Sequence, residues 1–139
     1  MDILGVGINP LAVGLSAVLS FAIGVVWYGV VFRDMWVRAQ GFSDETIKNM
    51  ESASSVPMIV SFVGALVTAT VMSMIIKSLH IVDLSEALST AFLLWLAFPG
   101  AIGLMNTLYG MRSLTGFVID ATYDLVYILA MAAIIVWLP

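Results

Sequence analysis

The stretch that decides the fold is residues 114–138, which read LTGFVIDATYDLVYILAMAAIIVWL. A helix needs about 20 mostly apolar residues to cross the hydrocarbon core of a bilayer. This stretch is long enough, contains no Lys or Arg, and has only Asp120 and Asp124 as charged residues. It therefore predicts a transmembrane helix that carries two carboxylates.

Three other apolar stretches have a similar length, at about residues 10–32, 57–76 and 84–108. Pro10 and Pro57 stand at the start of two of them, where a helix leaves its first amides free and tolerates proline. No stretch alternates apolar and polar residues as a transmembrane barrel strand does. We therefore predict an all-α fold: an integral membrane four-helix bundle with short loops, forming a single transmembrane domain of residues 1–139.

The composition of the chain also indicates that it is embedded in lipid. Of the 139 residues 62% are hydrophobic and 10% are charged, and the mean hydropathy is +1.11. A soluble domain is about half apolar and about a quarter charged. The lipid bilayer is therefore the expected partner. The net charge of −4 argues against nucleic acid, whose binding proteins carry basic patches.

Several classes of active site are missing from the sequence. There is no cysteine, and His80 is the single histidine, which excludes thiolate catalysis and a histidine-rich metal site within one chain. No nucleophile with its base and no phosphate-binding glycine loop is recognisable. We expect neither enzymatic activity nor a metal ion or cofactor.

The basic residues are distributed unevenly between the loops. Arg33, Arg38 and Lys48 lie between the first and second helices, and Arg112 lies between the third and fourth. Only Lys77 lies between the second and third helices. Because cytoplasmic loops carry the excess of Lys and Arg, we predict a multi-pass protein of the cell membrane with both termini outside.

The polar loop, residues 33–56, contains a signal for one short helix. Ser43 is a favourable N-cap, and Asp44 and Glu45 follow it at the positive end of the helix dipole. Trp36, just after the first span, is suited to the headgroup level of the membrane. We predict one interfacial helix that ties the first two spans together.

Small residues recur every four positions in two of the spans. Such ridges let membrane helices approach closely, so we predict that the first and second helices pack tightly together. The residues of the two ridges are Ala12, Ser16, Ser20 and Gly24 in the first helix, and Ser61, Ala65, Ala69 and Ser73 in the second.

Proline interrupts the third span at Pro99, followed by Gly100 and Gly103. A proline ring collides with the carbonyl four residues before it, here that of Trp95, and removes one backbone donor. We predict a kink at this point. It is either a hinge that lines a site, as in transporters with broken helices, or a bend that improves packing.

Asp120 and Asp124 are the candidate site. They are four residues apart and therefore share one face of the fourth helix, with Tyr123 and Tyr127 beside them. Asp124 lies about 15 Å beyond Leu114 along the helix, near the bilayer midplane. A central aspartate costs about 2.5–3.5 kcal/mol to insert, so these carboxylates should face protein or water.

Two interpretations of the aspartates remain open. An intramembrane acid is a functional candidate as a proton relay, a cation site or a counter-charge for a substrate. Alternatively, the aspartates are structural and hydrogen-bond to neighbouring helices, with Arg112 two turns before Asp120 on the same face. Asn106, near the end of the third helix, is placed to reach Arg112 or the aspartates.

The sequence resembles the domain-of-unknown-function 1761 family, small bacterial membrane proteins with about four spans. The resemblance covers nearly the whole chain and is most specific in the block formed by Gly24, Trp27 and Tyr28 with the downstream Phe32 and Trp36. The residues that carry it further are Asn9, Ala12, Val13, Gly41, Arg112, Ser113, Phe117, Val118, Ile119, Asp120 and Tyr123.

The resemblance implies a four-helix membrane protein of the bacterial inner membrane. It singles out Trp27, Tyr28, Trp36 and Asp120 as positions of the family pattern, whereas Asp124 lies outside that pattern.

Two kinds of function fit these observations. The first is a small ion, proton or solute transporter or channel, homo-oligomeric because four helices make a thin wall, with the aspartate face lining its path. The second is a non-catalytic accessory or assembly subunit of a larger membrane complex. The small-residue ridges and the aromatic anchors Trp27, Tyr28, Trp36 and Trp137 fit the second equally well. We favour the homo-oligomer.

Overall fold

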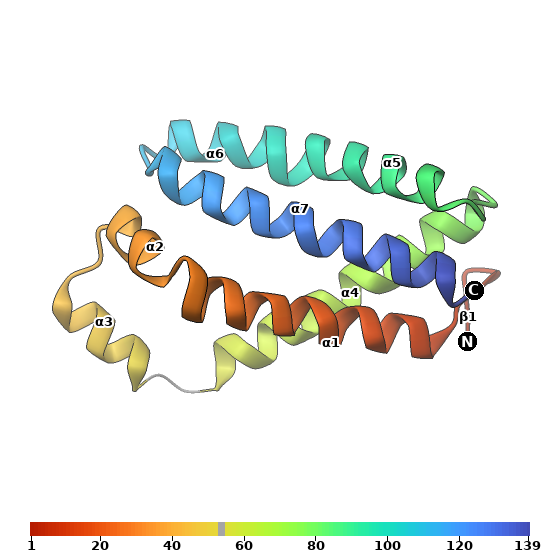
Figure 1. Cartoon of the computed structure of the whole chain (residues 1–139), viewed down its shortest axis with the longest axis horizontal. Helices are drawn as coiled ribbons and strands as arrows, with labels where there is room; N and C mark the ends of the chain where they lie inside the picture. Colours follow the sequence, from red (N-terminus) through yellow and green to blue (C-terminus); the bar gives the residue numbers. More distant parts are fainter. Residues whose placement is uncertain (53–54) are drawn as a thin grey trace.

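The computed structural model describes residues 1–52 and 55–139 and shows a bundle of long helices with two short helices at one end (Figure 1). The elements follow the chain in the order β1 (Asp2–Ile3), β2 (Val6–Gly7), α1 (Pro10–Val26), η1 (Trp27–Val31), α2 (Arg33–Gln40), α3 (Asp44–Glu51), α4 (Val56–Ser78), α5 (Leu84–Trp95), η2 (Leu96–Ile102), α6 (Gly103–Tyr109) and α7 (Leu114–Trp137). Here η1 and η2 are π-helical segments that continue α1 and join α5 to α6.

The described residues contain four helices that are long and apolar enough to cross a membrane, at Pro10–Val31, Val56–Ser78, Leu84–Tyr109 and Leu114–Trp137. Their bounds lie within two residues of the predicted spans. Side-chain caps begin three of these helices: Asn9, Asp83 and Ser113 each accept hydrogen bonds from amides of the first turn. The predicted all-α membrane bundle is confirmed.

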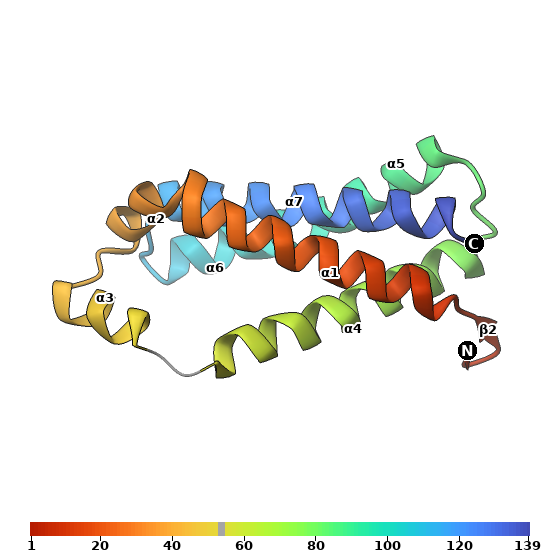
Figure 2. The ribbon, with the colours of Figure 1, turned by 60° about the horizontal axis from the view of Figure 1, so that its bottom comes forward.

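Helix α7 lies at the centre of the bundle. It packs against α1 on one side and against the α5–α6 helix on the other, and α4 crosses α1 and α7 from below (Figures 1 and 2). The buried residues of α4 all lie in its second half, at Ala69, Met72, Ser73 and Ile76. The first half of α4 diverges from the bundle and exposes its side chains (Figure 2).

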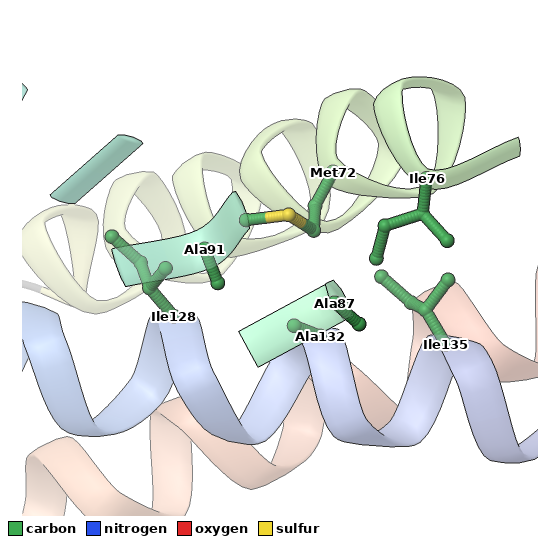
Figure 3. Close-up of a cluster of buried hydrophobic side chains, with 7 residues drawn as sticks. All are labelled: Met72, Ile76, Ala87, Ala91, Ile128, Ala132 and Ile135. Carbon is green, nitrogen blue, oxygen red and sulfur yellow. The ribbon is translucent and has the colours of Figure 1, made fainter. Parts of the chain in front are cut away.

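A cluster of small and branched side chains fills the end of the bundle near the termini. We call it the core cluster; Figure 3 shows its members Met72, Ile76, Ala87, Ala91, Ile128, Ala132 and Ile135. The three alanines are fully buried, which lets α4, α5 and α7 approach closely. In lipid this close approach, not exclusion of water, is what holds helices together.

The predicted pairing of the first two helices is confirmed over half of its length. Ala12, Ser16 and Ser20 of α1 are buried, as are Ala69 and Ser73 of α4, and the two helices pack against each other there.

The other ends of the two ridges depart from this prediction. Ser61 is exposed, because α4 diverges from α1. Gly24 lies against α7 instead of α4: a Cβ on it would be 2.8 Å from Oη of Tyr123.

Pro99 lies inside η2, and the helix continues through it into α6. In a π-helical segment each hydrogen bond spans one more residue than in an α-helix, which widens the turn. At Pro99, where we predicted a kink, the helix therefore has a widened turn. Space there is tight, since a Cβ on Gly100 would be 3.2 Å from the carbonyl oxygen of Trp95.

The described residues of the polar loop form two short helices where the sequence predicted one. The predicted helix is α3, which Ser43 caps by accepting from the amide of Thr46 at 3.2 Å. The unpredicted one is α2, which ends at Gly41 with a positive φ of 67°. Its mixed polar sequence has no apolar periodicity to reveal it, and the hydrogen bond that joins its Trp36 to Asp120 of α7 is a tertiary contact.

The basic residues divide between the two ends of the bundle as predicted. The α2 and α3 helices and the α6–α7 turn lie at one end, and both termini lie at the other with the α4–α5 turn (Figure 1). Arg33, Arg38, Lys48 and Arg112 therefore share one end, while Lys77 lies at the opposite end.

Candidate functional site

A cleft of about 370 Å³ lies between the α6 side of the third span and the first half of α7. We call it the α6–α7 cleft. It contains four of the six predicted site residues: Asn106, Arg112, Asp120 and Asp124. The other lining residues are Gln40, Phe98, Pro99, Ile102, Gly103, Thr107, Ser113, Phe117 and Ala121.

Small residues bring the two walls of the cleft together. A Cβ on Gly103 would be 3.1 Å from the ring of Phe117, so the aromatic ring uses the space that the glycine leaves. Thr107 is buried and donates its hydroxyl to the carbonyl oxygen of Gly103 at 2.8 Å. This hydroxyl is therefore satisfied within its own helix.

Asp124 is the lining residue of the cleft that lies nearest the middle of α7. It is the eleventh of the 24 residues of α7, close to the middle of the span. Among the described residues, its carboxylate has no hydrogen-bond partner, although the side chain is largely enclosed. A half-buried carboxylate at this depth that protein does not satisfy is open to a ligand.

Asp120, one turn nearer the cleft mouth, is held in place. Its Oδ1 accepts a hydrogen bond from Oη of Tyr28 at 2.7 Å and a second from Nε1 of Trp36 at 3.0 Å. The two donor rings pack edge to face, with centroids 5.4 Å apart. Because Tyr28 lies in η1 and Trp36 lies in α2, this carboxylate joins three elements that are distant in sequence.

Tyr123 and Tyr127 are not among the residues that line the cleft, although both lie beside the aspartates on α7. At 100° per residue the tyrosines lie on the flank of the aspartates that faces α1. Tyr123 donates its hydroxyl to the carbonyl oxygen of Ser20 at 3.1 Å and packs edge to face on Tyr28. The ring centroid of Tyr127 lies 5.0 Å from that of Tyr123, and Tyr127 packs against the core cluster.

Three tryptophans bind consecutive residues of α7. Nε1 of Trp27 donates to the carbonyl oxygen of Ile119 at 3.2 Å, Trp36 donates to Asp120, and Nε1 of Trp95 donates to the carbonyl oxygen of Ala121 at 2.7 Å. Sequence reasoning singled out Trp27 and Trp36 and missed Trp95. The available signal was that a tryptophan in mid-span needs a partner for its indole N–H.

The mouth of the cleft is polar and carries one positive charge. Arg112 and Asn106 are both exposed and line the rim. In the described part of the chain, the ion pair found is Arg33 with Glu51 at 2.9 Å, on the surface, and Arg112 makes none with Asp120. Arg112, Asp120 and Asp124 instead line one cleft.

Gln40 is the cleft residue that sequence reasoning had no means to find. It comes from α2 and lies against α7, since a Cβ on Gly116 would be 3.2 Å from its Nε2. The cleft thus has three walls: α6 with η2, α7, and the end of α2.

The charged residues that line the cleft are two aspartates and one arginine. Two carboxylates face one guanidinium, and the guanidinium is at the rim. The described residues contain no group of three or more His, Cys, Asp or Glu side chains that could hold a metal ion. Much of the remaining lining is apolar or aromatic, including Phe98, Ile102 and Phe117.

The family model described as "Protein of unknown function (DUF1761)" matches residues 11–136 of the chain. The chain belongs to the DUF1761 family. The searches of curated proteins and of solved structures returned no match. In this DUF1761 protein, three residues on which the resemblance rested, Tyr28, Trp36 and Asp120, meet in one hydrogen-bonded group.

Proposed function

We propose that this DUF1761 protein binds a small cationic solute in the α6–α7 cleft and carries it across the membrane. The observation that carries the proposal is the position of Asp124: unpartnered among the described residues, near the middle of a span, in the lining of a polar cleft. Intramembrane acids characteristically mark substrate and ion pathways.

The size and lining of the cleft favour an organic cation over a bare ion. A water molecule occupies about 30 Å³, so a cleft of about 370 Å³ is far larger than a dehydrated ion needs. Small-molecule sites are typically about 300–1,000 Å³, mostly apolar, with a few placed polar groups. Phe98 and Phe117 supply apolar surface, and aromatic faces attract organic cations.

Uptake into proteoliposomes tests this function. Wild-type protein should accumulate radiolabelled methylammonium or tetraethylammonium, and Asp124→Asn should lower the rate about tenfold or more, because a charged hydrogen bond to the ligand is lost. The matched control is Asp44→Asn, the same change at an exposed position of α3. Equal uptake by Asp124→Asn and wild type, both folded by size-exclusion profile, would contradict the proposal.

We further propose that the cleft opens toward the cytoplasm and that both termini are outside. Four of the five Lys and Arg residues lie at the cleft end of the bundle, as the positive-inside rule requires. Because the chain has no cysteine, single cysteines report sidedness cleanly. An impermeant maleimide added to intact cells should label His80→Cys and spare Asn49→Cys; the reverse pattern would overturn this orientation.

The transport path also bears on assembly. The cleft ends at Asp124, and beyond it the core cluster fills the bundle. We therefore propose a homo-oligomer in which the path continues between copies. Mass measurement in mild detergent should give a multiple of 15.0 kDa. A monomer, or a fixed ratio with other subunits, would instead favour the accessory role.

A further inference from the structure

We infer that α2 is a movable wall of the α6–α7 cleft, latched to Asp120 through Trp36 and released when a cation occupies that carboxylate. The inference deepens the proposed function and rests on it. It concerns how the site opens and closes, and it assigns Trp36 a positioning role.

The attachment of α2 is small and specific. None of its residues is buried, and its outer face carries the exposed Arg33, Asp34 and Arg38. Two of its side chains reach the site: Trp36 through its hydrogen bond to Asp120, and Gln40 against Gly116 at the cleft rim. A short helix with no buried residue has a low free energy of local opening.

Both ends of α2 are suited to act as turning points. At its start, Phe32 breaks the helix with φ −113° and ψ 9°, directly after the π-helical segment η1. At its end, Gly41 has a φ of 67°, and a Cβ there would meet no atom within 4 Å. Hinges are commonly a few element-terminal residues of this kind.

The latch and the ligand compete for one carboxylate. Oδ1 of Asp120 already accepts from both Tyr28 and Trp36, and an indole N–H can only donate. A cation bound at this carboxylate neutralises part of its negative charge and so weakens the charged hydrogen bond from Trp36. The charges that share the cleft with Asp120 are Asp124 and Arg112. By linkage, undocking α2 must strengthen cation binding by the same factor.

A disulfide can lock the wall in place. A Cβ on Gly116 would be 3.8 Å from Cβ of Ala39, which matches the mean Cβ–Cβ distance of about 3.8 Å in disulfides. The natural chain has no cysteine, so Ala39→Cys with Gly116→Cys forms the only bridge available within one chain, and a non-reducing gel separates it from bridges between copies. Its rate of formation under mild oxidant measures how often α2 is docked.

The experiment follows disulfide formation with and without methylammonium or tetraethylammonium at constant ionic strength. The cation should slow formation about fivefold or more, within the usual range of coupling between sites. Trp36→Phe in the same background should slow formation without cation and remove most of the cation effect. The control Trp27→Phe, whose indole binds the backbone of α7 outside α2, should keep the cation effect.

Uptake by the double-cysteine variant, Ala39→Cys with Gly116→Cys, separates the proposed gate from the proposed transport. The oxidised protein should transport at most about a tenth as fast as the reduced protein, with recovery after reduction. Uptake by the reduced form with no cation effect on disulfide formation would overturn the gate and leave transport standing. A cation effect without uptake would support the gate and overturn transport, and loss of both would overturn both.

Discussion

The two halves of α7 are packed in opposite ways. The second half, from Tyr127 on, presents Ile128, Ala132 and Ile135 to the core cluster, where alanines of α5 and α7 are fully buried. The first half presents Asp120 and Asp124 to a cleft and is held by indole and phenol hydrogen bonds from three other segments.

The difference shows how one span combines rigidity with an accessible site. Close packing of small residues tolerates little change, because displaced neighbours have nowhere to go. Hydrogen bonds from long aromatic side chains keep the helices farther apart and leave space for solvent or ligand. The predictions below test this contrast, and each pairs a variant with a matched control.

The largest effect is expected where the packing is closest. Ala132→Leu forces three extra carbons into the core cluster, where Ala132 has no exposed surface. It should lower the free energy of unfolding by about 1–3 kcal/mol, measured by thermal denaturation in mild detergent. Ala22→Leu, the same change at an exposed position of α1, should be close to neutral. Equal effects would mean that the core cluster is loosely packed.

A smaller loss is expected at Gly24, where α1 meets Tyr123. Alanine normally improves a helix over glycine by up to about 1 kcal/mol, and Gly14→Ala, with no atom within 4 Å of its new Cβ, should show that gain. Gly24→Ala instead places a Cβ 2.8 Å from the Tyr123 hydroxyl and should cost about 1–2 kcal/mol. A gain at both positions would refute this contact.

Hydrogen bonds of the aromatic half should contribute less individually. Trp95→Phe removes the 2.7 Å bond to the carbonyl of Ala121 and should cost about 1 kcal/mol. Trp137→Phe is the control, because Trp137 is 79% exposed at the end of α7. If both variants unfold at the same temperature, the indole bond to Ala121 contributes nothing measurable.

The smallest effect concerns the cap of α5, at the core-cluster end. Hydrogen bonds from the Ser85 hydroxyl, then from the amides of Glu86 and Ser85, lower the pKa of Asp83 below its ordinary value. An aspartate whose pKa is lower in the folded than in the unfolded chain stabilises the fold at pH values above its unfolded pKa of about 3.9. This stabilisation is lost as the pH falls through the pKa of the folded state. The melting temperature of wild type should therefore fall more between pH 5 and acid pH than that of Asp83→Asn. Parallel curves would contradict this role of the cap.

Local features were predictable from sequence, and contacts between distant segments were not. Hydropathy located all four spans, and Ser43 caps α3 as predicted. The four-residue spacing of Asp120 and Asp124 correctly placed them on one face. The partners of Asp120 lie 84 and 92 residues away, and nothing in a local pattern indicates which of several aromatic residues reaches it.

The sequence alone determined that this protein is a four-span membrane bundle with two acids in its last helix. Length and hydropathy are properties of contiguous segments, and lipid forces each segment to satisfy its own backbone as a helix. Tertiary structure alone decided that Asp120 is held by Tyr28 and Trp36 while Asp124 faces the cleft. That outcome depends on how α7 is rotated against its neighbours, which small-residue packing sets and a single span cannot encode.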